Sequence, residues 1–489
     1  MNRREFIQAL GACTALQALP HMALAAGSPA WKLGFDGVSG DLSPLSLKVQ
    51  GAVPEDFSGR LYRNGPALYE RGGRRYQHWF DPDGMIQCYE FGPQGVTHQG
   101  RLVRTAKLQQ EEQAGRFLFD GAGTHFADAL PARSNEDGNV ANISIQPLNG
   151  ELLALWEAGS AHRIDPQTLE TLGVKHWSDE LKGVPFSAHP HFDDNGDLWN
   201  IGSVPFGARP MLVLYHVAKD GTLRNARLHQ LEFPGYMHDF VLTPRYLVAL
   251  NSSAVQGAGD TFVDRMRWNP SQPSQLLVFN RSDLSLQATI EVPATFVFHF
   301  GNGWEQGREI SFTACAYPDA RIMSDGMRLL AQQQSGAYHT GAELVRYTID
   351  LPARAARVEP LGVVMEFPGF DQRQPFRAQT LYGSAGQERS ESSLGSAVVA
   401  VDPLTGKQDR FDYGDGVVVE EPLFVPGEGN NYLVHSYLDY RAGRTGVALL
   451  NAQRLASGPL MRAEMDRVTP LGFHGCFLPG ADASGPNSA

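Results

Sequence analysis

The sequence predicts an all-β protein, and three observations lead to that prediction. Short apolar runs recur between turn signals along almost the whole chain, whereas stretches with the 3.6-residue period of amphipathic helices are scarce. The 52 glycines and 31 prolines exceed average usage and favour frequent turns. A β chain of 489 residues must protect its sheet edges, and a ring of blades is one economical solution. No repeat of fixed period is visible, so the propeller does not follow from repeats.

The N-terminal residues are typical of an export signal rather than of the fold. Arg3-Arg4 forms a twin-arginine pattern, a mildly apolar run extends from Ala9 to Leu24, and Ala23-Leu-Ala25 resembles a cleavage site between small residues. No other segment approaches the ~20 apolar residues that a membrane-spanning helix needs. We therefore expect a twin-arginine signal peptide over residues 1–26 and a periplasmic mature protein, with a single β domain over 27–479 and a disordered tail over 480–489.

Charge and cysteine content exclude several classes of partner and scaffold. The net charge of −12 argues against nucleic acid and against adsorption to anionic lipid, because both require basic patches. Only Cys88, Cys315 and Cys476 remain after removal of the signal, which is too few for a disulfide framework.

The predicted strands follow one another in chain order, each bounded by turn residues. Asn149-Gly150 is a hairpin signal, and Asp165-Pro-Gln-Thr-Leu and Asp402-Pro-Leu-Thr-Gly look like equivalent blade turns. The helix candidates are short, at Gln109–Arg116 and Asp319–Gln334. The clearest strands are predicted within 59–62, 85–91, 151–156, 198–202, 211–215, 246–250, 275–279, 396–401, 431–435 and 447–450.

Four histidines lie in similar settings at predicted strand ends or between glycines. His189 stands before Pro190 and the turn signal Asp193-Asp-Asn-Gly-Asp197, which precedes a strand. Each of the four has apolar and partly aromatic neighbours, where an imidazole needs a partner. That partner can be a backbone carbonyl or a metal ion, since neutral imidazole is the commonest protein metal ligand. The four are His189, His238, His299 and His474.

Several motifs in one order carry a resemblance to a known family. They include Leu61-Tyr-Arg-Asn-Gly-Pro66, Met237-His-Asp239 and Glu421-Pro-Leu-Phe-Val-Pro426. The chain resembles the carotenoid cleavage oxygenases, which are non-haem iron dioxygenases, from about Gly51 to Leu478. The other motifs are His78-Trp-Phe-Asp-Pro-Asp-Gly-Met-Ile86, Ala154-Leu-Trp-Glu157, Ala188-His-Pro190, Phe298-His299, Trp304-Glu305, Met365-Glu-Phe-Pro368 and Gly472-Phe-His-Gly475.

The resemblance implies a fold and a metal site. It implies a seven-bladed β-propeller, with a short helical and loop cap over the face that carries the metal. On this basis one Fe(II) per subunit is held by the four histidines, which are both the metal-binding and the catalytic residues, and O₂ is the co-substrate. Carboxylates would accept hydrogen bonds from the far ring N–H groups and fix the imidazole tautomers. From ligand type alone zinc or copper fits as well. The implied outer carboxylates are Glu157, Glu366 and Glu421.

The implied reaction is oxidative cleavage of a conjugated C=C bond in a carotenoid or apocarotenoid, which yields two carbonyl products. Trp156, Tyr236 and Phe298 lie within two residues of proposed site residues and resemble aromatic residues that line the family's tunnel, although ordinary core packing explains each one equally well. The stilbene-cleaving branch typically has a lysine directly before the first glutamate. The tryptophan here therefore points toward an apolar polyene.

Alternative functions and partners remain open at this stage. A related enzyme could cleave a stilbenoid or isomerise a retinoid-like ester, a propeller hydrolase could use calcium or zinc, and a non-catalytic propeller could only bind. We expect a monomer that takes a lipophilic conjugated small molecule and does not bind nucleic acid. Residues 117–132 are a candidate apolar lip for peripheral membrane contact. The two ways in which the chain departs from the family motifs, Ala141-Asn-Ile-Ser144 and Phe80-Asp-Pro-Asp-Gly84, touch no proposed ligand.

Overall fold

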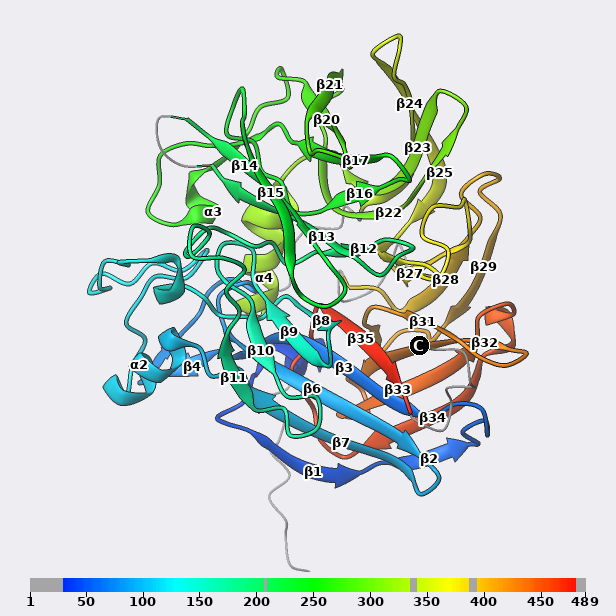
Figure 1. Cartoon of the computed structure of the whole chain (residues 1–489). Coiled ribbons are helices and arrows are strands. Elements are labelled where there is room, and N and C mark those ends of the chain that lie inside the picture. Colours follow the sequence, from blue (N-terminus) through cyan, green and yellow to red (C-terminus); the bar gives the residue numbers. More distant parts are fainter. Residues whose placement is uncertain (1–29, 206–208, 335–340, 387–393, 481–489) are drawn as a thin grey trace, which may run out of the picture.

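The computed structural model describes residues 30–205, 209–334, 341–386 and 394–480, and these form the predicted all-β fold. The predicted signal peptide and all but the first residue of the predicted tail lie outside these ranges. Seven antiparallel sheets of four to six strands form the blades of a propeller, and Figure 1 shows them arranged as a ring. Two further sheets have two strands each.

Both ends of the chain build the blade that closes the ring. β3 (Gly59–Leu68) pairs on one side with β6 (Asp83–Gly92) and on the other with the last strand, β35 (His474–Pro479). This pairing joins the N-terminal and C-terminal segments by backbone hydrogen bonds, so the ring leaves no open sheet at the join. The outer strands of this blade are β7 (Gly95–Leu102) and β1 (Leu42–Ser46).

The other blades are meanders in chain order, apart from one N-terminal strand, β2, at the outer edge of the last blade. Their bounds are β8 Ser144–Leu148, β9 Glu151–Leu155, β10 His162–Ile164 and β11 Thr171–Val174; β12 His191–Phe192, β13 Leu198–Val204, β14 Met211–Val217 and β15 Leu223–Gln230; β16 Phe240–Leu242, β17 Tyr246–Asn251, β20 Ser274–Asn280 and β21 Leu286–Val292; β22 Phe296–Gln306, β23 Glu309–Tyr317, β24 Glu343–Asp350 and β25 Ala355–Val364; β26 Glu366–Gly369, β27 Leu381–Ala385, β28 Ala397–Val401 and β29 Gln408–Asp412; β30 Val417–Val419, β31 Leu423–Pro426, β32 Asn431–Asp439, β33 Arg444–Asn451, β34 Pro459–Met465 and β2 Lys48–Gly51.

The predicted turns occupy the positions that the sequence indicates. Asn149 and Gly150 have φ values of 48° and 79° and join β8 to β9 as a two-residue hairpin. Asp165 and Asp402 each start the turn from the third strand of a blade to its outermost strand, and each carboxylate accepts two backbone N–H groups in that turn. The two turns are therefore equivalent, as predicted.

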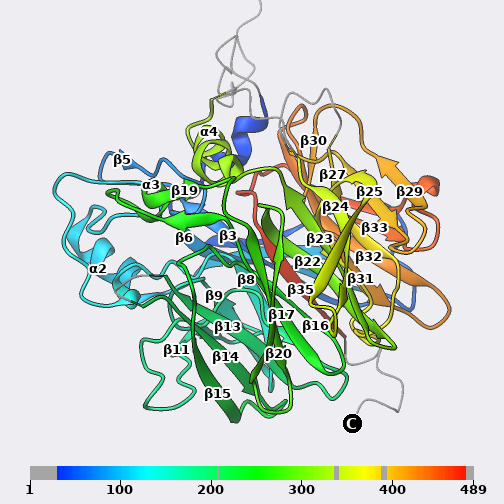
Figure 2. The ribbon, with the colours of Figure 1, turned by 90° about the horizontal axis from the view of Figure 1, so that it is seen from above.

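The helices are short, and those over residues 30–35, 262–265, 322–326 and 327–331 gather on one face of the ring. The candidate over Asp319–Gln334 is a π-helical turn, η3 (Ile322–Gly326), followed by α4 (Met327–Ala331). α4 packs against η1 (Ala30–Phe35), and Figure 2 shows the two side by side over the strand ends. The candidate over Gln109–Arg116 begins earlier, as α2 (Ala106–Ala114), because the Thr105 side chain caps the N–H of Leu108. The remaining short elements are α3 Phe262–Arg265, η2 Asn135–Asp137, η4 Leu455–Ser457, β4 Glu70–Arg71, β5 Arg74–Arg75, β18 Ala254–Gln256 and β19 Met266–Trp268.

Residues 117–132 lie partly in the core, and their contact with a membrane stays a prediction. Phe117 and Phe119 are buried, and Phe117 packs on Tyr76 with ring centroids 4.1 Å apart, so its ring contributes to the core. Leu130 is the large apolar side chain of this stretch that is exposed. Within the described ranges no helix has the length and apolar character to cross a bilayer. Cys88, Cys315 and Cys476 are buried free thiols, as the cysteine count predicts.

Candidate metal centre

The four candidate histidines lie in or just before the innermost strands of four blades. His189 precedes β12 by two residues, His238 precedes β16 by two, His299 lies in β22 and His474 opens β35. These strands lie nearest the ring axis, so residues that are far apart in sequence meet there. All four side chains are buried.

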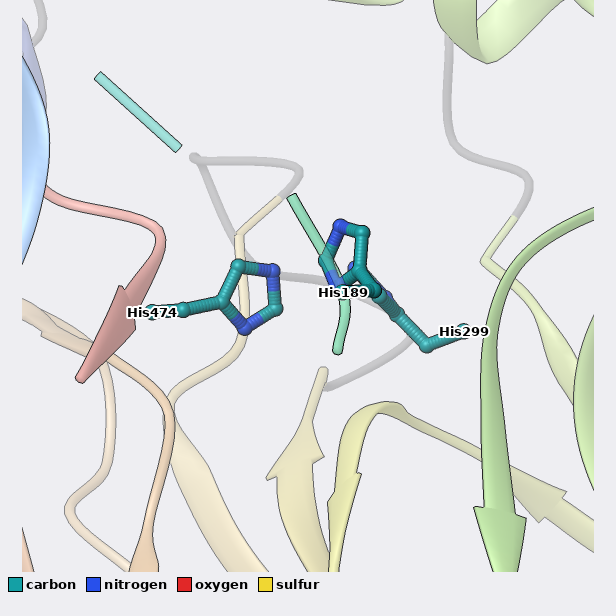
Figure 3. Close-up of side chains that lie close together, drawn as sticks. All are labelled: His189, His299 and His474. Atoms are coloured by element: carbon teal, nitrogen blue, oxygen red, sulfur yellow. The ribbon is translucent and has the colours of Figure 1, made fainter. Parts of the chain in front are cut away.

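Three of these imidazoles offer nitrogen atoms that lie within 4.8 Å of one another, namely those of His189, His299 and His474. Figure 3 shows the three side chains pointing toward one another, with His474 entering from the side opposite His299. The ring of His238 lies next to them, with its centroid 4.3 Å from that of His189 and 5.3 Å from that of His299. The fold therefore brings the rings of all four histidines close together, and three of them have nitrogen atoms within 4.8 Å of one another.

Each of the three candidate carboxylates holds the Nδ1 atom of a different histidine. Glu366 accepts from His299 at 2.6 Å, Glu421 accepts from His474 at 2.9 Å, and Glu157 contacts Nδ1 of His238. An ionised carboxylate can only accept, so each Nδ1 carries the proton and each Nε2 keeps its lone pair. In the described part of the chain no carboxylate pairs with His189, the fourth ring.

The donor set fits a soft or borderline metal ion. Nε2 of His189 and Nε2 of His299 are buried and have no hydrogen-bond partner among the described residues. A buried nitrogen lone pair without a partner is costly, and a cation at this point would satisfy both atoms. Imidazole ligands suit iron, zinc, copper and cobalt better than calcium or magnesium, which prefer oxygen.

The electrostatic environment favours neutral imidazoles at two of the three converging positions. Burial and the neighbouring rings of His238, His474 and His299 lower the pKa of His189 well below its usual value. Burial also lowers the pKa of His474, and the charge and hydrogen bond of Glu421 offset this lowering only in part. Burial disfavours the charged form of His299 as well, but the charge and hydrogen bond of Glu366 raise its pKa overall.

Asp239 joins the chain segments that carry three of the histidines, a role that the sequence analysis missed. It directly follows His238, and its Oδ1 accepts from Nε2 of His191 at 2.7 Å. Its Oδ2 accepts from the backbone N–H of Phe300 at 2.8 Å. The side chain thus ties the strand after His238 to His191, two residues after His189, and to Phe300, directly after His299. Its position beside His238 in the sequence was the available signal.

A mainly apolar cavity of about 290 Å³ opens beside the histidines. His238, His299 and His474 line one part of it. Its other walls are largely aromatic and aliphatic, as in most small-molecule sites. Representative wall residues are Trp79, Phe80, Phe298, Tyr317, Met327 and Leu330.

Of the three aromatic residues expected to line the tunnel, one lines this cavity. Phe298 does, and its ring lies 4.9 Å from that of His238. Trp156 and Tyr236 do not line it, so that expectation is corrected for both. Trp156 is half-buried among the apolar residues of a neighbouring core. Tyr236 borders a second cavity, of about 390 Å³, which Glu157 also lines.

Tyr236 acts instead on the carboxylate beside His238. Its hydroxyl donates to Oε1 of Glu157 at 2.6 Å and lies 2.8 Å from Nδ1 of His238. Burial and the charge of Glu157 raise the pKa of Tyr236 well above its usual value, so the hydroxyl keeps its proton and remains a donor. The sequence placed the right residue near the site but assigned it the wrong contact, because ring direction depends on the fold.

Comparisons with known proteins agree with this arrangement. The sequence model of the family described as retinal pigment epithelial membrane protein matches residues 38–479. The chain is 29% identical to the apocarotenoid-15,15'-oxygenase of Synechocystis, over 91% of this chain and 96% of that protein. It is 26% identical to the isoeugenol monooxygenase of Pseudomonas nitroreducens, over 89% and 95%. The crystal structure of the cobalt-substituted Synechocystis enzyme superposes with a TM-score of 0.81 at 25% identity, over 92% of this chain and 98% of that chain.

Proposed function

Since this chain belongs to the carotenoid cleavage oxygenase family, we propose that it is an iron-dependent dioxygenase that cleaves a conjugated double bond of an apocarotenoid or carotenoid into two carbonyl products. The observation that carries the proposal is the set of three histidine–glutamate pairs beside an apolar cavity. The ligands proposed for the iron are His189, His238, His299 and His474. When bound, ferrous iron supplies the site at which dioxygen is activated.

The protein residues have separate tasks in this proposal. The carboxylates Glu157, Glu366 and Glu421 fix the tautomer and the direction of three imidazoles, which leaves each Nε2 free to act as a ligand. Four neutral nitrogen donors add no negative charge, so the metal keeps its full positive charge. Because the carboxylates stay outside the ligand set, they tune the histidines without occupying positions needed by the substrates.

The cavity orients the alkene and excludes water. Phe298 and Phe80 both pack near the ring of His238, with centroids 4.9 Å and 6.4 Å away, so an alkene that enters the cavity meets flat apolar surfaces next to the metal ligands. A conjugated chain gains from burial in such a channel and has few polar groups to satisfy. Positioning of the reacting bond then lowers the entropic part of the barrier.

A smaller phenylpropenoid or stilbenoid alkene is the second candidate substrate class. The cavity volume of about 290 Å³ favours it, because ligand sites usually span about 300–1,000 Å³ and a long polyene needs the larger part of that range. The relative that is an isoeugenol monooxygenase supports the same alternative. Trp156 stands at the position where the stilbene-cleaving branch typically has lysine, but its side chain does not line the cavity and therefore does not decide between the two substrate classes.

One experiment tests the metal and the substrate class together. The protein is purified without oxygen, its iron is quantified, and it is incubated in air with a β-apocarotenal series, isoeugenol and a hydroxystilbene. We expect about one iron per chain and two carbonyl products from the apocarotenal, identified by mass. Iron with cleavage of only the phenolic alkenes would select the second candidate. A protein without metal affinity and without turnover would be a binding propeller.

We further propose that the protein is exported through the twin-arginine route and acts as a periplasmic monomer. The basis is the Arg3-Arg4 pattern and the small-residue site before Ala26. Cell fractionation and N-terminal sequencing of the mature protein test export, and light scattering tests the monomer. Recovery of the full-length chain in the cytoplasm would contradict the export proposal.

A further inference from the structure

Arg63 is a fully buried arginine whose guanidinium contacts Glu421, one of the carboxylates that hold the candidate metal ligands. It lies in β3, with a side chain that is 1% exposed. Nη1 donates to Oε2 of Glu421 at 2.9 Å, and Nη2 donates to the backbone carbonyl of Phe473 at 2.9 Å. The other oxygen of the same carboxylate, Oε1, holds Nδ1 of His474. A continuous chain of contacts therefore runs from guanidinium to carboxylate to imidazole.

The three carboxylates of the site differ in the hydrogen-bond donors that they have besides the histidines. Glu157 receives a second donor that is neutral, the hydroxyl of Tyr236. Oε1 of Glu366 is buried and has no partner within the described ranges. Of the three, Glu421 has an ion pair with an arginine, and its Oε2 also accepts from the N–H of Gly475 at 2.8 Å.

The planar guanidinium fixes two segments of chain at once. One branch holds the side chain of Glu421, and the other holds the carbonyl directly before His474. A planar fork with fixed donor directions is suited to this, whereas a lysine ammonium is a single point of charge. Because Arg63 pairs with Gly475 across β3 and β35, the guanidinium also acts where the ring closes.

The ion pair with Arg63 compensates the negative charge of Glu421 inside the protein. The side chain of Glu421 is 13% exposed, and its carboxylate lies between the guanidinium of Arg63 at 2.9 Å and the imidazole of His474 at 2.9 Å. Without Arg63 the carboxylate would lose its only arginine partner in the described part of the chain, and its orientation toward His474 would depend on one backbone N–H. A buried carboxylate in that state relaxes toward another partner or toward water.

We propose that Arg63 is a positioning residue of the metal centre, which fixes the carboxylate of Glu421 and through it the direction of the His474 ring. The inference rests on the proposed metal site and deepens it. It assigns a task to the arginine of the Leu61-Tyr-Arg-Asn-Gly-Pro66 motif that sequence reasoning left without one.

The test compares cobalt(II) binding by the metal-free full-length protein and its variants. Cobalt is the probe because its visible absorption reports coordination geometry without turnover. The variants are Arg63→Met, which removes the fork, and Arg63→Lys, which keeps the charge. Arg281→Met is the matched control: the side chain of Arg281 is only 10% exposed, pairs with one carboxylate, Asp193, and donates to backbone carbonyls. Its partners belong to none of the contacts described for the metal centre.

We expect Arg63→Met to weaken cobalt binding by about tenfold or more and to alter the visible spectrum, since loss of an outer contact to a metal ligand has effects of this size. Arg63→Lys should give an intermediate affinity. Arg281→Met should lower the unfolding temperature of the metal-free protein and leave cobalt affinity and spectrum unchanged. In a Glu421→Ala background, Arg63→Met should cause a much smaller additional loss of affinity, because the contact with Glu421 is already absent and only the hydrogen bond to the carbonyl of Phe473 remains to be lost.

Results that contradict the proposed metal site differ from results that contradict only the role of Arg63. If wild-type protein binds no cobalt or iron, the proposed metal site and this inference both fail. If wild type binds and the two Arg63 variants match it in affinity and spectrum, only the inference fails. It fails likewise if Arg281→Met weakens binding as much as Arg63→Met, since the effect would then follow from general loss of stability. Should Arg63→Met not fold, the lysine variant decides between the same outcomes.

Discussion

Replacing Glu366 or Glu421 by glutamine should weaken metal binding to different extents, although each carboxylate accepts a hydrogen bond from Nδ1 of a histidine. Oε2 of Glu366 accepts from His299 at 2.6 Å and from the N–H of Phe367 at 3.0 Å, whereas its Oε1 is buried without a partner among the described residues. A glutamine can therefore keep its carbonyl on the two donors and place its NH₂ group where no donor stands. Only the charge of the acceptor is lost.

Glu421 offers no such arrangement. Oε1 accepts from His474 at 2.9 Å, and Oε2 accepts from Arg63 at 2.9 Å and from the N–H of Gly475 at 2.8 Å. Either orientation of a glutamine amide points its NH₂ group at an N–H donor. One buried donor is then left unsatisfied, and the buried guanidinium loses its counter-charge.

The difference can be put in energetic terms. Exchanging a charge-assisted hydrogen bond for a neutral one costs about 1 kcal/mol, so Glu366→Gln should weaken metal binding by roughly fivefold. Breaking a buried ion pair by removing one partner costs roughly 3–5 kcal/mol. If about half of that cost appears in metal affinity, Glu421→Gln should weaken binding by roughly 10- to 70-fold.

The assay is anaerobic competition for Fe(II) between each variant and a chelator of known affinity, with thermal unfolding of the metal-free proteins measured in parallel. Glu421→Gln should show the lower unfolding temperature and the weaker binding. Equal affinities for the two variants, or a larger loss in Glu366→Gln, would show that the hydrogen bonds accepted by these carboxylates do not determine the affinity for Fe(II).

Three further outcomes follow from the structure. Tyr236→Phe removes the hydroxyl that donates to Glu157 but borders no part of the substrate cavity, so kcat and iron content should fall while KM stays close to wild type; a rise in KM alone would contradict this. Phe298→Ala enlarges the cavity, so KM should rise with iron retained, and the free energy of unfolding should fall by about 3–5 kcal/mol in denaturant titrations; unchanged kinetics would remove Phe298 from the substrate site. Burial lowers the pKa of His98 to about 3 and that of His435 to about 4, so both stay neutral in the fold while the unfolded chain takes up protons near pH 6.5. The free energy of unfolding should therefore fall as the pH drops from about 6.5 toward 4, by about 1.4 kcal/mol per pH unit for each histidine, and His435→Gln should reduce that slope; a flat profile would oppose the prediction.

The sequence alone predicted the class of fold and most of the local geometry. Alternating apolar runs, the Asn149-Gly150 hairpin and the equivalent Asp165 and Asp402 turns are decided by neighbouring residues, because backbone conformation at glycine, asparagine and aspartate is a local property. The helix over Asp319–Gln334 was likewise found where its pattern lies, although the π-helical turn was not. The number of blades came from the resemblance, since no repeat of fixed period reveals it.

The candidate ligands could be named from the sequence, but their convergence could not be derived from it. His189 and His474 are separated by most of the chain, and only the pairing of β3 with β35 closes the ring and brings them together. The same holds for side-chain direction: Tyr236 was placed near the site yet turns its hydroxyl to Glu157 rather than its ring to the cavity.

The contacts of Arg63 and Asp239 separate what the sequence determines from what only the tertiary structure determines. Both residues stand in motifs that the sequence makes visible, but their partners, Glu421 for one and His191 and Phe300 for the other, come from other blades. Composition and local pattern determine which strands and turns form, because those depend on residues a few positions apart. Which buried charges meet depends on how the blades pack around the axis, and that is decided only in the tertiary structure.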